Sequence, residues 1–136
     1  MTFANRGGSG LGCTTGCGTV FKVSTSGKET VLHNFKGDPK DGALPEAGLT
    51  VVNGELYSTT LYGGSVGCKT GCGTVFKVST SGKETVLYNF KGDPKDGAIP
   101  GADLTVLNGE FYSTTLYGGS GLGCTFGCGT VFKISP

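Results

Sequence analysis

The stretch that decides the fold is GTVFKVSTSGKETVL, residues 18–32, which recurs unchanged at residues 73–87. The match continues through NFKGDPKDGA, and YSTTLYGG also occurs twice, at residues 57–64 and 112–119. A third copy of the opening segment begins at Gly129, and the offset between copies is 55 and then 56 residues. Self-similarity at a fixed period is typical of repeat architectures, in which each copy forms one structural unit.

Each repeat predicts four short strands, A to D, separated by turn signals. In the C-terminal unit, strands A to C are expected at residues 104–107, 110–117 and 130–134. Strands C and D of the first unit are expected at residues 19–24 and 29–35. Asn108-Gly109 between strands A and B is a strong hairpin signal, because both residues tolerate positive φ. The segment 36–42 then crosses to the next unit.

Apolar side chains fall on both faces of these strands. Phe21 and Val23 share one face while Val20 lies on the other, which favours sheets that are covered front and back. The prediction is an all-β, β-propeller-like fold of tandem four-stranded antiparallel blades, about two and a half in this chain. A β-solenoid or a β-sandwich is the competing architecture.

The repeats divide one domain, residues 1–136, into three units. We expect a partial unit at 1–47, a full unit at 48–90 and a full-to-partial unit at 91–136, in the strand order BCD-ABCD-ABC. The first B strand, near residues 2–8, is degenerate. Closed propellers typically use about 4–8 blades, so both ends of this array are expected to expose apolar faces.

Composition excludes several classes of protein. The 27 glycines argue against helices. Lys and Arg (11) balance Asp and Glu (10) without a basic stripe, so no nucleic-acid partner is expected. No apolar stretch approaches the ~20 residues of a membrane helix, so no membrane insertion is expected. The N-terminus lacks an apolar signal core, so any export signal is expected to lie outside this sequence.

Three linked motifs resemble a known family. They are the GTVFK strand, the Asp-Gly-Ala-x-Pro crossover (41–45 and 96–100) and the LYxTTxxGG strand, and together they resemble the GloVer (Gloeo/Verruco) tandem repeat. The resemblance implies a bacterial protein of unassigned activity, often exported or surface-anchored through a separate sorting signal. This chain has few repeats and is expected to lack such an anchor. The family motifs name no catalytic residue.

The six cysteines form three Cys-x-x-x-Cys pairs, one in each loop between strands B and C: Cys13/Cys17, Cys68/Cys72 and Cys124/Cys128. One pair per repeat favours a local structural disulfide in each loop, and flanking glycines let the backbone bend to bonding geometry. Disulfides would indicate an oxidising compartment, either extracellular or at the cell surface. Zinc binding and free thiols are the alternatives, but the pairs lie one repeat apart and no His accompanies them.

Few residues suggest chemistry. His33, the only histidine, has Tyr88 at the equivalent position, which suits a strand surface better than a general base. Asp38 and Asp41, with Asp93 and Asp96, lie in GDPKDG segments, where Asp, Pro and Gly favour a turn over a calcium site. No Ser-His-Asp or Cys-His set can be assembled, so we expect no enzyme, no cofactor and no metal.

The candidate ligand-binding residues are two aromatic-glycine segments, Tyr62-Gly63-Gly64 and Tyr117-Gly118-Gly119. A tyrosine beside glycines at a strand end can stack on a sugar ring, and one weak site per blade would gain avidity for a repetitive glycan. Alternatively, these tyrosines pack between blades.

The sequence therefore predicts a non-enzymatic structural protein. Its copies are expected to stack through blade faces into a homo-oligomeric ring or an extracellular filament. A lectin-like glycan-binding module is the alternative function. A fragment of a longer array is the alternative explanation of the open ends.

Overall fold

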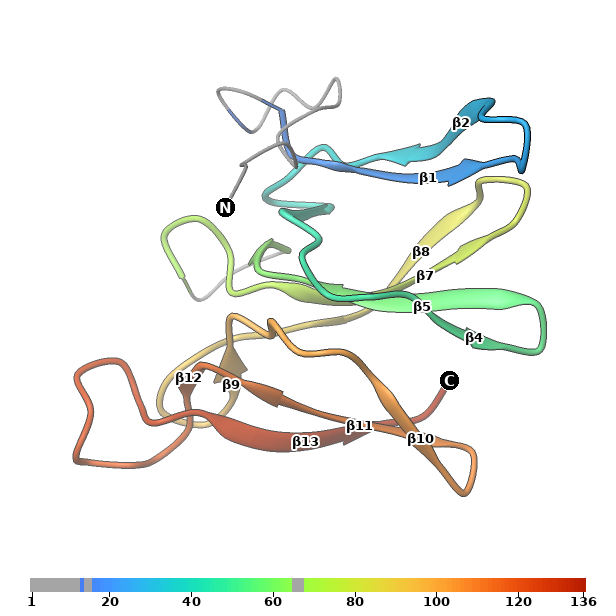
Figure 1. The fold of residues 1–136 in the computed structure, drawn as a ribbon. Coiled ribbons are helices and arrows are strands. Elements are labelled where there is room, and N and C mark those ends of the chain that lie inside the picture. The colour runs from blue at the N-terminus through green and yellow to red at the C-terminus, as the bar shows by residue number, and fades with distance from the viewer. Residues whose placement is uncertain (1–12, 14–15, 65–67) are drawn as a thin grey trace.

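The protein is all-β in the computed structural model, which describes residues 13, 16–64 and 68–136 (Figure 1). Within these ranges the strands of every sheet are antiparallel and no helix occurs. The all-β prediction is confirmed. The degenerate B strand expected near residues 2–8 lies outside the described residues.

Three main sheets follow one another along the chain. The first contains β1 (Thr19–Val23) and β2 (Glu29–Asn34). The middle sheet has the order β4-β5-β7-β8, with bounds Thr50–Val52, Glu55–Thr60, Thr74–Ser79 and Glu84–Asn89. The third has the order β10-β11-β13, with bounds Thr105–Leu107, Glu110–Thr115 and Thr130–Ile134. The middle sheet is thus a complete four-stranded meander.

The expected hairpin turns form where the sequence places Asn-Gly. Asn53 and Gly54 have φ of 50° and 77°, and Asn108 and Gly109 have φ of 51° and 78°. Positive φ at both central residues is the geometry of a type I′ turn, which matches the twist of the flanking strands.

The second strand of each repeat is shorter than the sequence predicts. β11 ends at Thr115, and Tyr117–Gly118 forms a separate strand, β12, that pairs with β9 (Gly97–Ala98). In the preceding repeat, β6 (Tyr62–Gly63) pairs with β3 (Gly42–Ala43) in the same way. The chain leaves the main sheet at Leu61 and Leu116, and Gly63 and Gly118 in the small strands have φ of 80° and 84°, a conformation that glycine adopts readily.

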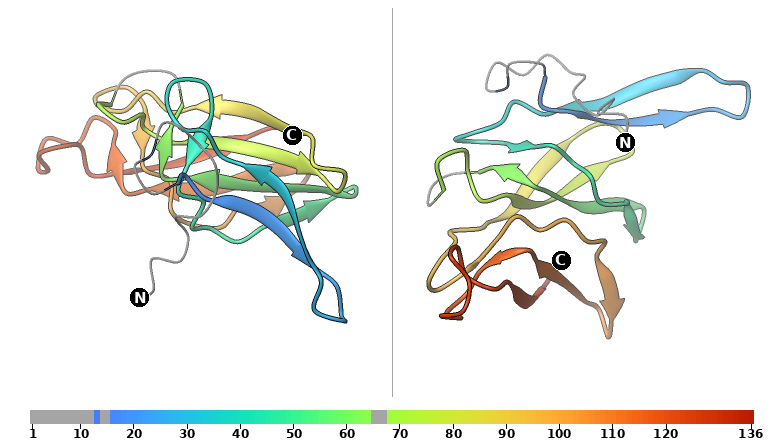
Figure 2. Two further views of the ribbon diagram at one scale, coloured as in Figure 1. Left: turned by 90° about the horizontal axis from the view of Figure 1, so that it is seen from above. Right: turned by 60° about the vertical axis from the view of Figure 1, so that its left-hand side comes forward.

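The three sheets stack face to face, as the right-hand view in Figure 2 shows. The junction between the first and middle sheets buries one apolar cluster: Cys17, Val20, Phe35, Ala43, Phe76 and Val78. The junction between the middle and third sheets buries another: Tyr57, Cys72, Val75, Phe90, Ala98, Leu104 and Phe111. The middle sheet is therefore covered on both faces, as the distribution of apolar residues predicts.

The two junctions use the same contacts. The rings of Phe35 and Phe76 meet edge to face with their centroids 5.0 Å apart, and those of Phe90 and Phe132 do so at the same 5.0 Å. Polar bonds add to the second junction, where the Thr59 hydroxyl donates to the Pro100 carbonyl at 3.0 Å. Each repeat therefore presents one kind of surface to the repeat before it and another to the repeat after it.

The outward faces of the first and third sheets carry the same residue types but are exposed. Phe21 and Val23 on β1 are each 54% exposed, whereas their counterparts Phe76 and Val78 in the middle sheet are fully buried. Val131 on β13 is 79% exposed, whereas its counterpart Val75 is fully buried. We call Phe21 and Val23 the first end face, and Val131 with the adjacent Thr114 the second end face.

Candidate functional site

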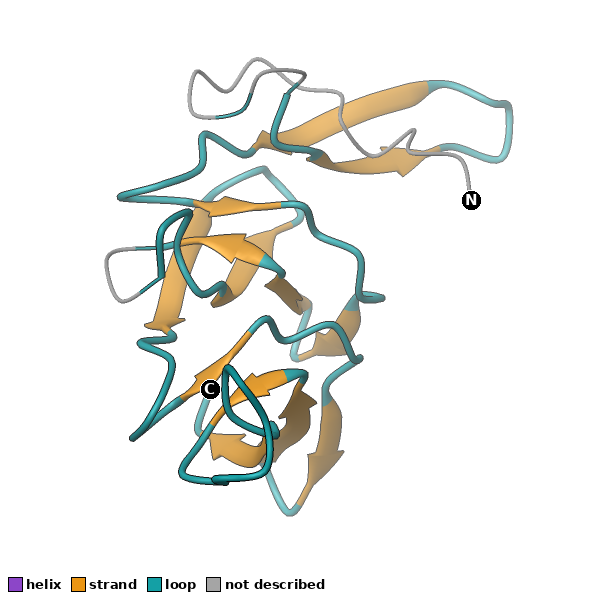
Figure 3. Cartoon of the chain, turned by 90° about the vertical axis from the view of Figure 1, so that its left-hand side faces the viewer, coloured by secondary structure: helices purple, strands orange, loops and turns teal. Residues whose placement is uncertain are grey.

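A cleft lies between the middle and third repeats at the loop-rich side of the molecule, which faces the viewer in Figure 3. Its volume is about 530 Å³, within the range of small-ligand sites. It contains both tyrosines that the sequence singles out, together with segments of the cysteine loops and the crossover: Tyr62, Cys68, Lys69, Thr70, Gly71, Asp93, Ala98, Ile99, Tyr117 and Phe126.

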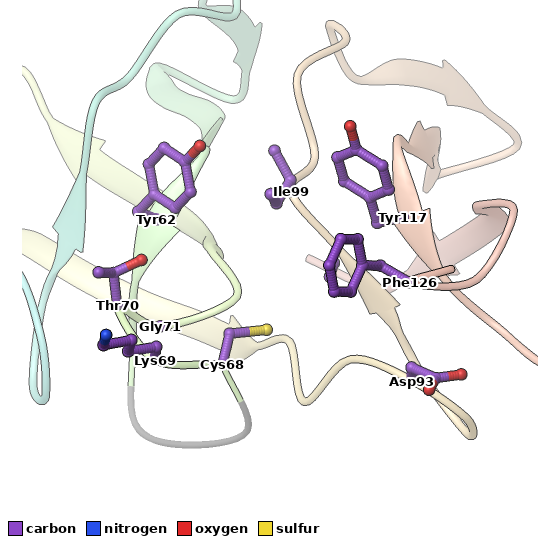
Figure 4. A pocket seen from close by; sticks show the side chains of 10 residues that line it. Tyr62, Cys68, Lys69, Thr70, Gly71, Asp93, Ile99, Tyr117 and Phe126 are labelled. Atoms are coloured by element: carbon purple, nitrogen blue, oxygen red, sulfur yellow. The ribbon is translucent and has the colours of Figure 1, made fainter. Parts of the chain in front are cut away.

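The aromatic side chains line opposite walls of this cleft. Tyr62 stands on one side, and Tyr117 and Phe126 stand on the other, with Ile99 between them (Figure 4). The rings of Tyr117 and Phe126 are perpendicular, with centroids 6.3 Å apart. Tyr117 is 43% and Phe126 69% exposed, so their faces are accessible to a ligand. Tyr62 also packs against the core between the first and middle sheets, and its contact with a ligand stays a prediction.

The glycines of the two Tyr-Gly-Gly segments have a backbone role. A Cβ at Gly63 would overlap the Asp41 carbonyl, and one at Gly118 would overlap that of Asp96. Gly64 and Gly119 have φ of 87° and 82°, and their amides donate to these same carbonyls at 2.8 Å. These contacts hold the strand end against the crossover and thereby fix the positions of Tyr62 and Tyr117. Direct contact of the glycines with a ligand stays a prediction.

All six cysteines form the three expected local disulfides, Cys13–Cys17, Cys68–Cys72 and Cys124–Cys128. The paired Cα atoms lie 5.1–5.3 Å apart, within the usual range for a disulfide. The Cys72 carbonyl accepts the Ile99 amide at 2.8 Å. The middle disulfide therefore fixes one wall of the cleft, and the disulfides indicate an oxidising environment.

Ile99 has an unusual backbone conformation for a β-branched residue. Its φ is 57°, and Leu44 has the same value at the equivalent position of the preceding repeat. The Ile99 amide is bonded to Cys72, and its carbonyl accepts the Leu116 amide at 3.1 Å. The crossover is thus held between the cysteine loop and the end of the second strand. The Asp38–Pro39 and Asp93–Pro94 peptide bonds that precede it are cis.

Asp41 and Asp96 hold the crossover turns through backbone hydrogen bonds. Asp41 accepts the amides of Lys36 at 2.9 Å and Gly42 at 2.7 Å, and Asp96 accepts those of Lys91 and Gly97, both at 2.8 Å. These bonds fit the turn interpretation of the GDPKDG segments. Burial alone would raise the pKa of Asp41, but the hydrogen bonds from His33, Lys36 and Gly42 lower it below its ordinary value.

The residues paired with these aspartates differ between the repeats. His33 Nε2 lies 3.1 Å from Asp41 Oδ2, whereas the Tyr88 hydroxyl donates to Asp96 at 2.9 Å. Glu84 of the middle sheet comes close to the first pair, and one ligand atom each of His33, Asp41 and Glu84 lies within 4.8 Å of the others. Burial, and then the negative charge of Asp41, raise the pKa of Glu84 to about 7.

The model of the Gloeobacter/Verrucomicrobia repeat family matches residues 6–136. The chain belongs to this family. No curated protein and no solved structure matches the chain. The matched range covers the three sheets, the cleft and all three disulfides of this Gloeobacter/Verrucomicrobia repeat protein.

Sequence reasoning missed several residues of these sites. Phe126 stands in a cysteine loop where the other copies have Thr15 and Thr70, so the repeat gives no signal for it. Glu84 occupies the same repeat position as Glu29, and only the stacking of the sheets brings it to His33.

Among the described residues, no helix is long and apolar enough to cross a membrane.

Proposed function

We propose that this Gloeobacter/Verrucomicrobia repeat protein is a non-enzymatic structural protein whose copies stack through their end faces. The observation that carries the proposal is the exposure of Phe21, Val23 and Val131, whose counterparts are buried in the middle sheet. The units are blades of a propeller-like array, and the stacked copies form a ring or an extracellular filament. The disulfides support an extracellular or cell-surface location.

The two end faces are complementary, because each carries the kind of residue that the other kind contacts at the junctions within the chain. Within the chain, Val20 packs in one cluster with Phe76 and Val78, and Val75 packs against Phe132 and Ile134. A second copy would place its Phe21 and Val23 against Val131 of the first copy. The contact joins two different surfaces, so it repeats head to tail and closes only if the rotation permits.

The energetics favour reversible assembly. Burial of one large apolar side chain contributes about 1.5–3 kcal/mol. Association costs roughly 4–15 kcal/mol in lost translational and rotational freedom. Three such side chains contribute about 4.5–9 kcal/mol together, which is comparable to that cost and not far above it. We therefore expect the degree of assembly to depend on protein concentration.

Sedimentation velocity on the untagged, oxidised chain over a wide concentration range tests this proposal. The sedimentation coefficient should rise with concentration, and Val131→Lys should abolish the rise by placing a charge on the second end face. Val51→Lys is the matched control, because Val51 is an exposed valine of the middle sheet, 65% accessible. A folded chain that stays monomeric at every concentration would overturn the proposal.

Glycan binding is the second candidate function, favoured by the cleft between Tyr62 and Tyr117. Tyrosine and phenylalanine faces stack on the apolar faces of sugar rings, and Lys69 and Asp93 supply polar groups at the rim. A glycan array probed with the native chain tests this function, with Tyr117→Ala as the variant that should lose any signal. An array without signal from folded protein would contradict it.

A further inference from the structure

His33, Asp41 and Glu84 form a cluster of potential metal ligands. This cluster lies in neither the end faces nor the cleft. His33 comes from β2, Asp41 from the crossover and Glu84 from β8, so the cluster spans the junction between the first and middle sheets. The side chains of His33 and Asp41 are 17% and 9% exposed. One imidazole nitrogen and two carboxylates are therefore directed at one partly enclosed point.

Glu84 supplies a second, independent observation. Its Oε1 atom is excluded from solvent and has no hydrogen-bond partner within the described part of the chain. A buried carboxylate oxygen without a partner is costly, because it loses its hydration without gaining a bond. A cation at this point would satisfy this oxygen and balance the neighbouring charge of Asp41.

The geometry of the other two ligands suits a tetrahedral cation. Zinc binds nitrogen and oxygen ligands at about 2.0–2.2 Å, so ligand atoms in a tetrahedral site lie about 3.4 Å apart. His33 Nε2 and Asp41 Oδ2 are 3.1 Å apart, close to this value. Asp41 Oδ2 also accepts the Lys36 amide, which leaves its second lone pair for the metal once His33 no longer bonds to it. The three ligand atoms lie within 4.8 Å of one another, so Glu84 needs a shift of up to about 1.4 Å to complete the set.

We propose that His33, Asp41 and Glu84 form a binding site for one divalent transition-metal cation, best matched by Zn²⁺, that links the first two sheets. The imidazole favours zinc over calcium, which requires six to eight oxygen ligands. Phe35 fixes the His33 ring by an edge-to-face contact at 4.8 Å. Three protein ligands leave the fourth position for water.

The protein contains its own control for this site. The equivalent position in the next repeat has Tyr88 hydrogen-bonded to Asp96. His33→Tyr therefore introduces an arrangement that this fold already accommodates, and it removes the nitrogen ligand without opening a cavity. Glu84→Gln keeps the shape of the second ligand and removes its charge.

The test is isothermal titration of ZnCl₂ into untagged, oxidised, chelator-treated full-length chain, with a parallel thermal melt. We expect one site per chain, a higher melting temperature with zinc, and Zn²⁺ affinity at least about tenfold above that for Ca²⁺. Both variants should weaken zinc binding at least about tenfold while melting as single transitions without zinc. No zinc binding by the native chain, equal binding by His33→Tyr, or tighter calcium binding would overturn the proposal.

Discussion

At the residue scale, the first aspartate pair shows how one side chain changes the chemistry of a repeated position. Asp41 and Asp96 hold the same turn, yet one is paired with a histidine and the other with a tyrosine. The sequence predicts the turn, because Asp, Pro and Gly set it locally. It cannot predict the approach of Glu84, because that depends on how far one stacked sheet is offset from the next.

The raised pKa of Glu84 predicts a pH-dependent stability in metal-free protein. The folded state holds this proton more tightly than the unfolded state, where the pKa is near 4.5. The stabilisation is present below about pH 4.5 and is lost as the pH rises through about 7. The titratable groups facing Glu84 are Asp41, which raises its pKa, and His33, which lowers it.

Urea denaturation between pH 4.5 and 7.5, with a chelator present, measures this effect. The native chain should lose about 1–2 kcal/mol over this range, since solvent screening reduces the full value for a half-exposed group. Glu84→Gln should lose less, because the side chain no longer ionises. Parallel curves for the two proteins would contradict this assignment.

Thr59 gives a second prediction at this scale. Its buried hydroxyl donates to the Pro100 carbonyl of the following repeat. Thr59→Val should destabilise the chain by about 1–3 kcal/mol, because that carbonyl is left without its partner. Thr114 occupies the same position on the exposed second end face, so Thr114→Val should change stability by less than about 0.5 kcal/mol in dilute protein. Equal effects in denaturant melts would refute the role given to this bond.

At the element scale, the main strands were predictable and the small sheets were not. Apolar runs bounded by Asn-Gly and Ser-Gly signal the strands of the three main sheets, and the strands expected at stated residues form with ends shifted by no more than two residues. The two-residue strands Gly42–Ala43 and Tyr62–Gly63 are too short to show a side-chain period. Their pairing requires glycine at position 42, because a Cβ there would overlap the Thr60 side chain.

The cysteine loops give a prediction at the same scale. Replacing Cys68 and Cys72 together with alanine should cost about 2 kcal/mol from the lost loop constraint, and more because Cys72 is buried at the junction. Replacing Cys124 and Cys128, both exposed, should cost no more than about 2 kcal/mol. Guanidinium denaturation of the two double variants measures both losses of stability. A larger loss from the exposed pair would show that burial does not determine how much each disulfide stabilises the chain.

At the scale of the whole molecule, the repeat determines both the core and the open surfaces. Apolar residues on both faces of a strand predict stacking, and the middle sheet shows that stacking on each side. The outward faces of the first and third sheets keep the same residues because the repeat conserves them. The proposed self-association would thus use the same junction between copies as within one copy.

Mixing two variants tests this claim most directly. Phe21→Lys blocks only the first end face, and Val131→Lys blocks only the second, so each variant alone should sediment as a monomer. In an equimolar mixture, the intact second end face of one can bind the intact first end face of the other. The account predicts that heterodimers form in the mixture and that the assembly stops at two chains. A mixture that stays monomeric at concentrations where the native chain assembles would contradict it.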